Sequence, residues 1–243
     1  NITPRQHIDF AARFGALHTH PLYPSIPDIP EMIVLDNNKD NPTDNDSWHT
    51  DVTFIETPPM ASILYAKHLP PVGGDTIWSD MKAAYDALSP AFREFLSGLD
   101  AVHDFARGFP QRGIVAKGAG EDKHAKALAE HPPVLHPVVR THPETGEDAL
   151  FVNFGFTERI KGLRRKESDA ILNMLFEHVT KPEFLVRWRW TPNAVAFWDN
   201  RITQHYAVND YLPHRRIMNR ATVLGDRPYH RSRKPAGLKT AAV

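Results

Sequence analysis

The chain has 243 residues, no formal net charge and no cysteine. This length is sufficient for one large domain with a sizeable core, and the charge balance argues against nucleic acid or an anionic membrane surface as the main partner. Without cysteine there can be no disulfide, thiolate zinc site or iron–sulfur cluster, so any metal must be held by carboxylates or by some of the 14 histidines.

Four helices are predicted from capping signals and apolar faces. Thr3-Pro4-Arg5-Gln6 is a capping box with proline at the first helical position. The other three show apolar residues at helical spacing. We predict helices from Thr3 to Gly15, from Ser79, from Ser89 to near Gly98, and from about Lys166 to Val179.

The remaining chain shows short strand-like runs separated by Pro, Gly, Asn and Asp. These runs cover residues 32–35, 63–66, 76–78, 149–152 and 194–198. The clearest strand pattern is 184–190, where Phe184, Val186, Trp188 and Trp190 alternate with two arginines.

Helices and strands do not alternate regularly, and no glycine-rich phosphate loop is present. The sequence therefore predicts a mainly β (α+β) fold, a barrel or double-sheet sandwich with flanking helices. We expect a single domain over 1–243, a C-terminal tail from about 231 and a candidate lid at Gln111 to Gly120. No apolar stretch is long enough to span a membrane, which predicts a soluble, cytoplasmic protein. The first residue, Asn1, is not a methionine, so we expect an N-terminal piece to be missing.

A His-x-Asp pair marks a candidate metal site at His49 and Asp51. In a strand, residues two apart project from the same face and can meet one metal. A second pair, His7 and Asp9, lies in the first predicted helix, where residues two apart do not face each other. On spacing alone, a solvated loop pair remains an alternative for His49 and Asp51.

The C-terminal third supplies a possible third ligand and two cations. His205 follows the Trp198 to Arg201 segment and would complete a set of two histidines and one carboxylate, typical of non-haem Fe(II) oxygenases. Arg216 and Arg220 share one face if their segment is a strand, and two buried guanidiniums suggest two anionic small molecules. Surface salt bridges are the alternative for either arginine.

With these residues, the chain closely resembles the Fe(II)- and 2-oxoglutarate-dependent taurine dioxygenase family. The motifs that carry the resemblance are Trp48-His49-Thr50-Asp51, Gly73-Gly74-Asp75-Thr76, Trp198 to His205, Arg216 to Arg220 and His136 to Pro143. The resemblance covers about Thr3 to Tyr229. It implies a double-stranded β-helix (jelly-roll) core, Fe(II) bound by His49, Asp51 and His205, and 2-oxoglutarate and O2 as cosubstrates.

The resemblance also implies roles for the residues around the metal. Thr76 and Arg216 would hold the distal carboxylate of 2-oxoglutarate. A small aminosulfonate, taurine, would be hydroxylated at the carbon bearing the sulfonate, giving sulfite and aminoacetaldehyde with succinate and CO2. Its binding residues would be His20, Tyr23, Asn45, Val52, Phe109, Phe156 and Arg220. A homodimer or homotetramer is expected on the same grounds.

Several alternatives stay open at the sequence level. Thr76 fits an ordinary strand position, His20 a loop histidine, Asn45 a turn, and the two phenylalanines a core. Phe154 places an aromatic where the resemblance leads us to expect a polar side chain. The resemblance therefore defines the substrate less closely than it defines the type of reaction. The rival functions are a relative acting on alkyl sulfates or other sulfonates, a zinc hydrolase with the same ligands, and a non-enzymatic jelly-roll binding protein.

Overall fold

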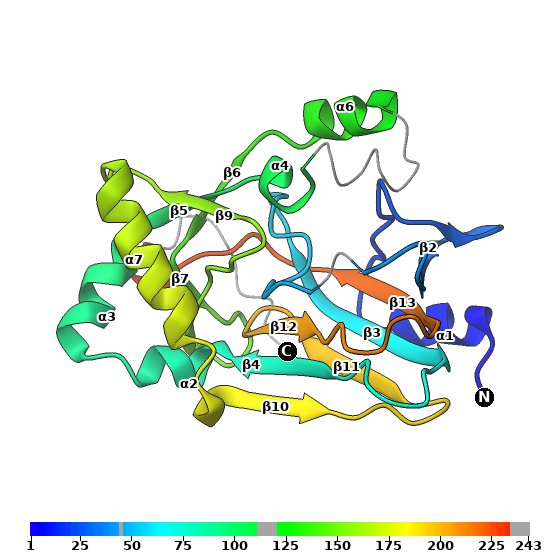
Figure 1. Ribbon diagram of the computed structural model, residues 1–243. Helices are drawn as coiled ribbons and strands as arrows, with labels where there is room; N and C mark the ends of the chain where they lie inside the picture. The colour runs from blue at the N-terminus through cyan, green and yellow to red at the C-terminus, as the bar shows by residue number, and fades with distance from the viewer. Residues whose placement is uncertain (44–45, 111–120, 234–243) are drawn as a thin grey trace.

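The computed structural model describes residues 1–43, 46–110 and 121–233, and antiparallel strands form its centre (Figure 1). The α-helices are α1 (Pro4–Ala11), α2 (Met81–Asp86), α3 (Pro90–Ser97), α4 (Phe105–Gly108), α6 (Glu121–Glu130) and α7 (Arg165–His178). The first strands are β1 (Ser25–Ile26), β2 (Ile29–Asn37), β3 (Pro59–His68), β4 (Thr76–Asp80), β5 (Asp100–His103) and β6 (Val134–Pro137). They are followed by β7 (Val139–Thr141), β8 (Asp148–Leu150), β9 (Thr157–Ile160), β10 (Leu185–Trp188), β11 (Val195–Asp199), β12 (Thr203–Ala207) and β13 (Arg216–Leu224).

All four predicted helices are present, although α1 ends at Ala11 and not at Gly15. Thr3 and Gln6 make the reciprocal capping box of α1, and the Asp80 side chain accepts from the first amides of α2. Within the described ranges, two α-helices were missed, α4 and α6. The first has only four residues, and the described buried residues of the second are only His124 and Ala127, so neither carries a clear periodic signal.

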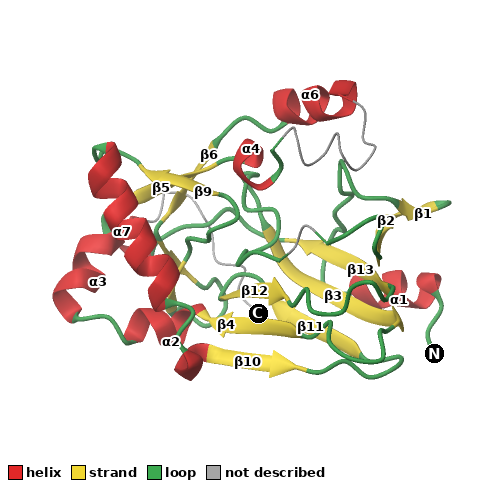
Figure 2. Ribbon diagram, viewed as in Figure 1, coloured by secondary structure: helices red, strands yellow, loops and turns green. Residues whose placement is uncertain are grey.

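Two antiparallel sheets enclose the region where the candidate residues gather. One has the order β1-β2-β13-β3-β11 and the other β10-β4-β12. Trp78 of β4 packs against Trp198 of β11 with ring centroids 5.4 Å apart, within a cluster that includes Leu64 and Met218. Side chains of both sheets therefore meet in one core. Figure 2 shows the strands at the centre with helices around them, which confirms the predicted mainly β architecture.

Helices cover the flanks of this core. α1 packs on β2 and β13 of the five-stranded sheet, and α7 packs on β9 beside the smaller sheets β6-β5-β9 and β7-β8 (Figure 1). Leu172 and Leu175 on one face of α7 join α2 and α3 in a second apolar cluster. None of the helices in the described ranges is long and apolar enough to cross a membrane.

The 184–190 segment differs from its prediction. Only Leu185–Trp188 is a strand, β10, and it lies at the edge of its sheet, paired with β4 alone. The side chains of Val186 and Trp188 remain 57% and 43% exposed, whereas Trp190, beyond the strand, is buried. The apolar residues of this alternating pattern therefore do not form a buried face in the edge strand. The candidate lid at 111–120 and the tail beyond Arg233 lie outside the described residues.

Candidate metal centre and anion pockets

The two histidines of the candidate metal site face each other across neighbouring chain segments. His49 and His205 form an antiparallel bridge in which each backbone amide donates to the other's carbonyl, at 3.0 and 2.7 Å. Their rings lie on the same side of the bridge with centroids 4.3 Å apart. Thr50 extends the pairing by donating its hydroxyl to the Thr203 carbonyl. The backbone itself therefore brings together two residues that are far apart in the sequence.

Asp51 joins them by a turn rather than by the strand geometry that the spacing predicted. Only His49 pairs with β12, and residues 51–54 form a turn. The Asp51 Oδ1 atom lies 3.9 Å from His49 Nε2 and 4.0 Å from His205 Nε2. Among the described residues, these three form the single group of three or more such side chains whose ligand atoms converge. His7, on α1, is instead a core histidine beside the Ile63 carbonyl.

The three side chains suit a divalent metal. Neighbouring ligands of an octahedral ion with bonds of about 2.1 Å lie about 3 Å apart, so each ligand would need to move by less than about 1 Å. His49 Nδ1 lies 2.7 Å from the Ser47 carbonyl oxygen, which can only accept, so Nδ1 carries the proton and Nε2 is the coordinating atom. Ser62 donates to Asp51 Oδ2 at 2.7 Å and orients the carboxylate.

Local charge keeps the ligands in the protonation states that a metal requires. Burial would raise the Asp51 pKa, but the Arg220 guanidinium and both histidines outweigh it and hold that pKa well below its usual range. Burial, followed by repulsion from His49, lowers the His205 pKa to about 3. Near neutral pH the site therefore offers one carboxylate and a neutral His205 imidazole.

Arg216 and Thr76 meet in a cavity beside this metal centre. β13 carries Arg216 and Arg220 on one face, as predicted, and both line this cavity together with Thr76 and His205. Trp190 Nε1 donates to Thr76 Oγ1 at 3.0 Å, which leaves the threonine hydroxyl proton for another acceptor. Burial lowers the pKa of Arg216, whose Nε donates to the Gly74 carbonyl.

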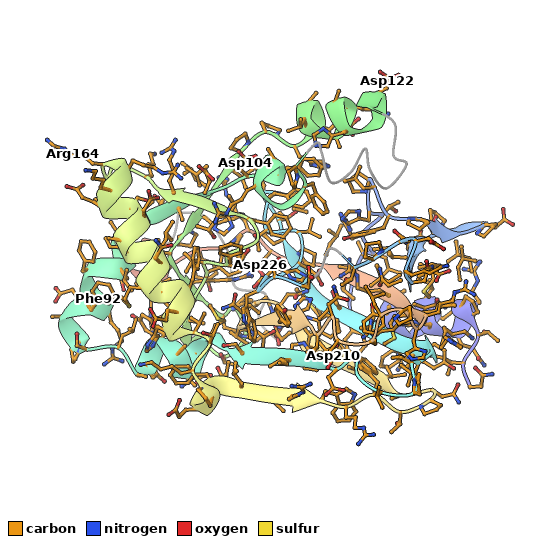
Figure 3. All side chains as sticks on the ribbon, in the orientation of Figure 1. Phe92, Asp104, Asp122, Arg164, Asp210 and Asp226 are labelled. Carbon is orange, nitrogen blue, oxygen red and sulfur yellow. The ribbon has the colours of Figure 1, made fainter. Side chains whose placement is uncertain are left out.

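The Gly73-Gly74 turn makes room for that arginine. Gly74 has φ +73°, and a Cβ there would lie 3.0 Å from Arg216 Cδ. The Gly74 amide donates to Asp210, which is labelled in Figure 3. The turn thus fixes the arginine stem at one end of the cavity.

A second cavity lies on the other side of Arg220. Six of the seven residues expected to bind the substrate line it, together with His49, Asp51 and Phe54; the six are His20, Tyr23, Val52, Phe109, Phe156 and Arg220. The seventh, Asn45, lies outside the described residues. Both cavities are small, about 30 and 20 Å³. Arg220 lines both of them and donates to Asp51 Oδ1 at 2.7 Å.

His20 presents a hydrogen-bond donor to the second cavity. Its Nδ1 accepts from the amides of Leu22 and Tyr23 at 3.2 and 3.3 Å. An imidazole that accepts at Nδ1 carries its proton on Nε2. Burial, and then repulsion from Arg220, lowers the pKa of His20 well below its usual value. The ring is therefore a neutral donor.

Val52 is held in an unusual backbone conformation by a buried polar network. Its φ of +54° lies in the left-handed region, which costs a β-branched residue about 1–3 kcal/mol. The following residue, Thr53, contacts His103 Nδ1 at 2.9 Å and accepts from Asn153 Nδ2 at 3.1 Å. Asn153 also accepts from the Phe156 amide, so the network positions two walls of the cavity together.

Sequence reasoning missed most of these supporting residues. Ser62 could have been suspected, because it is a hydroxyl within an apolar strand and buried hydroxyls need a partner. Asn200 donates to Ser62 and accepts from Trp198 Nε1, and no local pattern indicates that. Phe154, the unexpected aromatic, does not line either cavity and is 52% exposed.

Comparison with known protein families gives one family match. The family described as "Taurine catabolism dioxygenase TauD, TfdA family" matches residues 1–222. This range contains all three candidate metal ligands and both arginines.

Characterised relatives and solved structures are also similar to the chain. It is 40% identical over 220 residues to an alpha-ketoglutarate-dependent sulfate ester dioxygenase of Pseudomonas putida, covering 90% of this chain and 72% of the relative. It is 37% identical over 219 residues to an alkylsulfatase of Acinetobacter baylyi, covering 89% and 68%. A crystal structure of a taurine dioxygenase from Burkholderia xenovorans superposes with a TM-score of 0.79 at 37% identity, covering 96% of this chain and 75% of that one.

Proposed function

Because the chain belongs to the TauD/TfdA family of 2-oxoglutarate-dependent dioxygenases, we propose that it hydroxylates a small organic sulfate ester or sulfonate at the carbon next to the sulfur-bearing group. The observation that carries this proposal is the placement of His20 and Arg220 in an apolar cavity that also reaches His49 and Asp51. A hydrogen-bond donor and a guanidinium suit a sulfur oxyanion, and the aromatic walls suit a hydrocarbon chain.

His49, Asp51 and His205 would hold Fe(II), which supplies the oxidising chemistry together with 2-oxoglutarate and O2. The Thr76 hydroxyl and the Arg216 guanidinium would hold the distal carboxylate of 2-oxoglutarate, because both residues line the cavity beside the metal ligands and both carry hydrogen-bond donors. Across that metal centre, His20, Arg220 and the Val52 amide would bind the substrate anion. Tyr23, Phe109 and Phe156 would enclose the rest of the substrate, with Asn45 proposed from the family resemblance alone.

Charge balance favours a substrate with one net negative charge. Among the described residues lining the two cavities, the charged groups are the Asp51 carboxylate and the Arg216 and Arg220 guanidiniums, one net positive charge in all. A divalent metal and the 2-oxoglutarate dianion cancel each other. A singly charged alkyl sulfate then makes the buried site neutral, whereas zwitterionic taurine leaves one charge uncompensated, and uncompensated buried charge is unfavourable.

An alkyl sulfate is therefore the first candidate. Hydroxylation of its carbon next to the ester oxygen gives a hemiacetal sulfate that collapses to an aldehyde and sulfate, while 2-oxoglutarate and O2 yield succinate and CO2. Taurine is the second candidate, supported by the similarity to the taurine dioxygenase structure and by the Tyr23 hydroxyl, a possible partner for its amine.

Product analysis over a substrate panel tests this proposal. The protein with Fe(II) and 2-oxoglutarate should release aldehyde and sulfate from hexyl sulfate in amounts equal to the succinate formed, and it should release sulfite from taurine more slowly. Faster turnover of taurine would reverse the order of the two candidates. Turnover that continues without 2-oxoglutarate would refute the dioxygenase and favour a metal-dependent hydrolase.

Anaerobic titration separates an enzyme from a binding protein. Adding Fe(II) and then 2-oxoglutarate should produce a visible absorption change that His49→Ala abolishes, because the mutation removes one of the three converging ligands. A binding protein with no metal centre would give no such change.

A further inference from the structure

A third cavity lies behind the metal ligands, on the opposite face of β12. In a strand, successive side chains point to opposite faces, so Gln204 and Tyr206 point away from the side that His205 occupies. Both line a cavity of about 380 Å³ together with Trp48, which precedes His49. This volume is within the range of small-molecule sites, about 300–1,000 Å³. None of the three metal ligands, and neither arginine of β13, lines it.

Gln204, which lines this cavity, has a side-chain amide without hydrogen-bond partners among the described residues. The residue is fully buried, and neither its Oε1 nor its Nε2 has a hydrogen-bond partner within the part of the chain that the structure describes. Its backbone is held firmly, since Gln204 pairs with Ser79 of β4, and the Ser79 hydroxyl donates to the Val179 carbonyl just after α7. Burying an unpaired amide is unfavourable, and a ligand that pairs with both atoms would remove this cost.

Aromatic rings form the walls around that amide. Trp48 and Tyr206 lie against each other with centroids 5.6 Å apart, and Phe154 meets Phe176 edge to face at 5.8 Å. Phe154 is held by Arg107, whose Nε donates to its carbonyl and whose guanidinium lies 5.2 Å from its ring. Phe154 is the aromatic that departs from the family resemblance, and its exposed ring contributes to the mouth of this cavity.

The charged residues that line this cavity disfavour the anions proposed to bind at the metal centre. Asp46 and Glu177 both line the cavity, and none of the described residues that line it is a lysine or an arginine. Carboxylates there repel anions such as 2-oxoglutarate or a sulfate ester. A cationic ammonium or guanidinium group has no acceptor for Gln204 Nε2. The preferred ligand is therefore uncharged, planar enough to stack on aromatic rings, and able both to donate to and to accept from Gln204.

We propose that this cavity is a binding site for a small aromatic molecule carrying a primary carboxamide. The carboxamide pairs head to head with Gln204, its NH2 donating to Oε1 and its carbonyl accepting from Nε2, while its ring lies among Trp48, Phe154 and Tyr206. The site is separate from the metal centre and does not depend on the proposed reaction.

Binding of benzamide to the metal-free protein, without 2-oxoglutarate, tests the site. Benzamide should quench or shift the tryptophan fluorescence with a Kd of about 0.1–10 mM, the range expected for a ligand of this size. Benzoate should bind at least tenfold more weakly, because it cannot donate to Gln204 and is repelled by Glu177. Undetectable benzamide binding at 50 mM would refute the proposal.

Two variants and a matched control locate the binding. Gln204→Leu keeps a similar volume, removes both amide atoms and should weaken benzamide at least tenfold. Phe154→Ser should also weaken it, whereas Phe95→Ser, at another exposed phenylalanine on α3, should not. If Gln204→Leu does not fold, Gln204→Glu serves instead, since its added charge and lost donor should produce the same weakening. Equal affinity in the wild type and either Gln204 variant would overturn the assignment.

Discussion

Replacing Arg220 tests whether the positive charge beside Asp51 substitutes for the metal. Arg220 and Asp51 are both buried, and their Nη1 and Oδ1 atoms lie 2.7 Å apart. Arg220→Met keeps most of the aliphatic stem but leaves a buried carboxylate without its partner, which costs about 3–5 kcal/mol. A bound divalent metal would compensate that carboxylate directly. We therefore expect the variant to lose about 3–5 kcal/mol of unfolding free energy without metal, and no more than about 1 kcal/mol with saturating metal.

Urea unfolding under anaerobic conditions measures this difference, once with EDTA and once with saturating Mn(II). By thermodynamic linkage, a gap of about 3 kcal/mol corresponds to Mn(II) binding about 100-fold more tightly to the variant. Arg215→Met is the matched control, because Arg215 forms an ion pair with Asp36 at the exposed surface and should cost less than about 1 kcal/mol in either condition. Equal losses for Arg220→Met with and without metal, at unchanged Mn(II) affinity, would refute the reasoning.

Three further predictions follow from the same geometry. In steady-state assays, Arg216→Ala should raise the 2-oxoglutarate concentration needed for half-maximal turnover more than tenfold. It should raise the corresponding sulfate ester concentration less than threefold. Equal effects on the two concentrations would contradict separate anion sites. Gly74→Ala should lower the free energy of unfolding, measured with urea, by about 1–2 kcal/mol, because φ is +73° and the new Cβ would press on Arg216 Cδ. Gly146→Ala is the control, because Gly146 has a similar φ but no atom of the described residues within 4 Å of the new Cβ. The difference between the two variants measures the cost of the contact with Arg216. Burial lowers the pKa of His136 to about 4, so the unfolded state takes up a proton first, and this residue alone should contribute a fall in stability of about 3 kcal/mol between pH 6.5 and 4. His136→Asn should reduce the total pH dependence by that amount, while other buried histidines maintain the rest.

The elements and residues with local signals were predictable. A capping box, a proline at the start of a helix and a strand with two arginines on one face each depend on a few neighbouring residues, and α1, α3 and β13 confirm them. The His-x-Asp pair was found for a partly wrong reason, since Asp51 reaches His49 through a turn. What decides that turn is long-range: Thr53 is held by His103 and Asn153, which come from other parts of the chain.

Features that depend on contacts between distant parts of the chain could not be predicted from the sequence. The exposure of Trp188 depends on β10 being an edge strand, and the isolation of the Gln204 amide depends on what α7 and the segment before His49 place around it. Neither depends on residues nearby in sequence. A periodic pattern indicates which face of a strand is apolar, but the covering of that face is decided by sheet order.

The position of Arg220 also implies an order of assembly. While Asp51 has no metal, its charge holds Arg220 by a buried ion pair, and the guanidinium occupies the space between the two small cavities. Under the proposed function, a substrate anion competes with Asp51 for the same guanidinium. Once a divalent cation neutralises the carboxylate, that competition weakens and Arg220 can turn toward the substrate anion. On this proposal the ion pair makes substrate affinity depend on the metal, and it keeps the arginine compensated until the anion arrives.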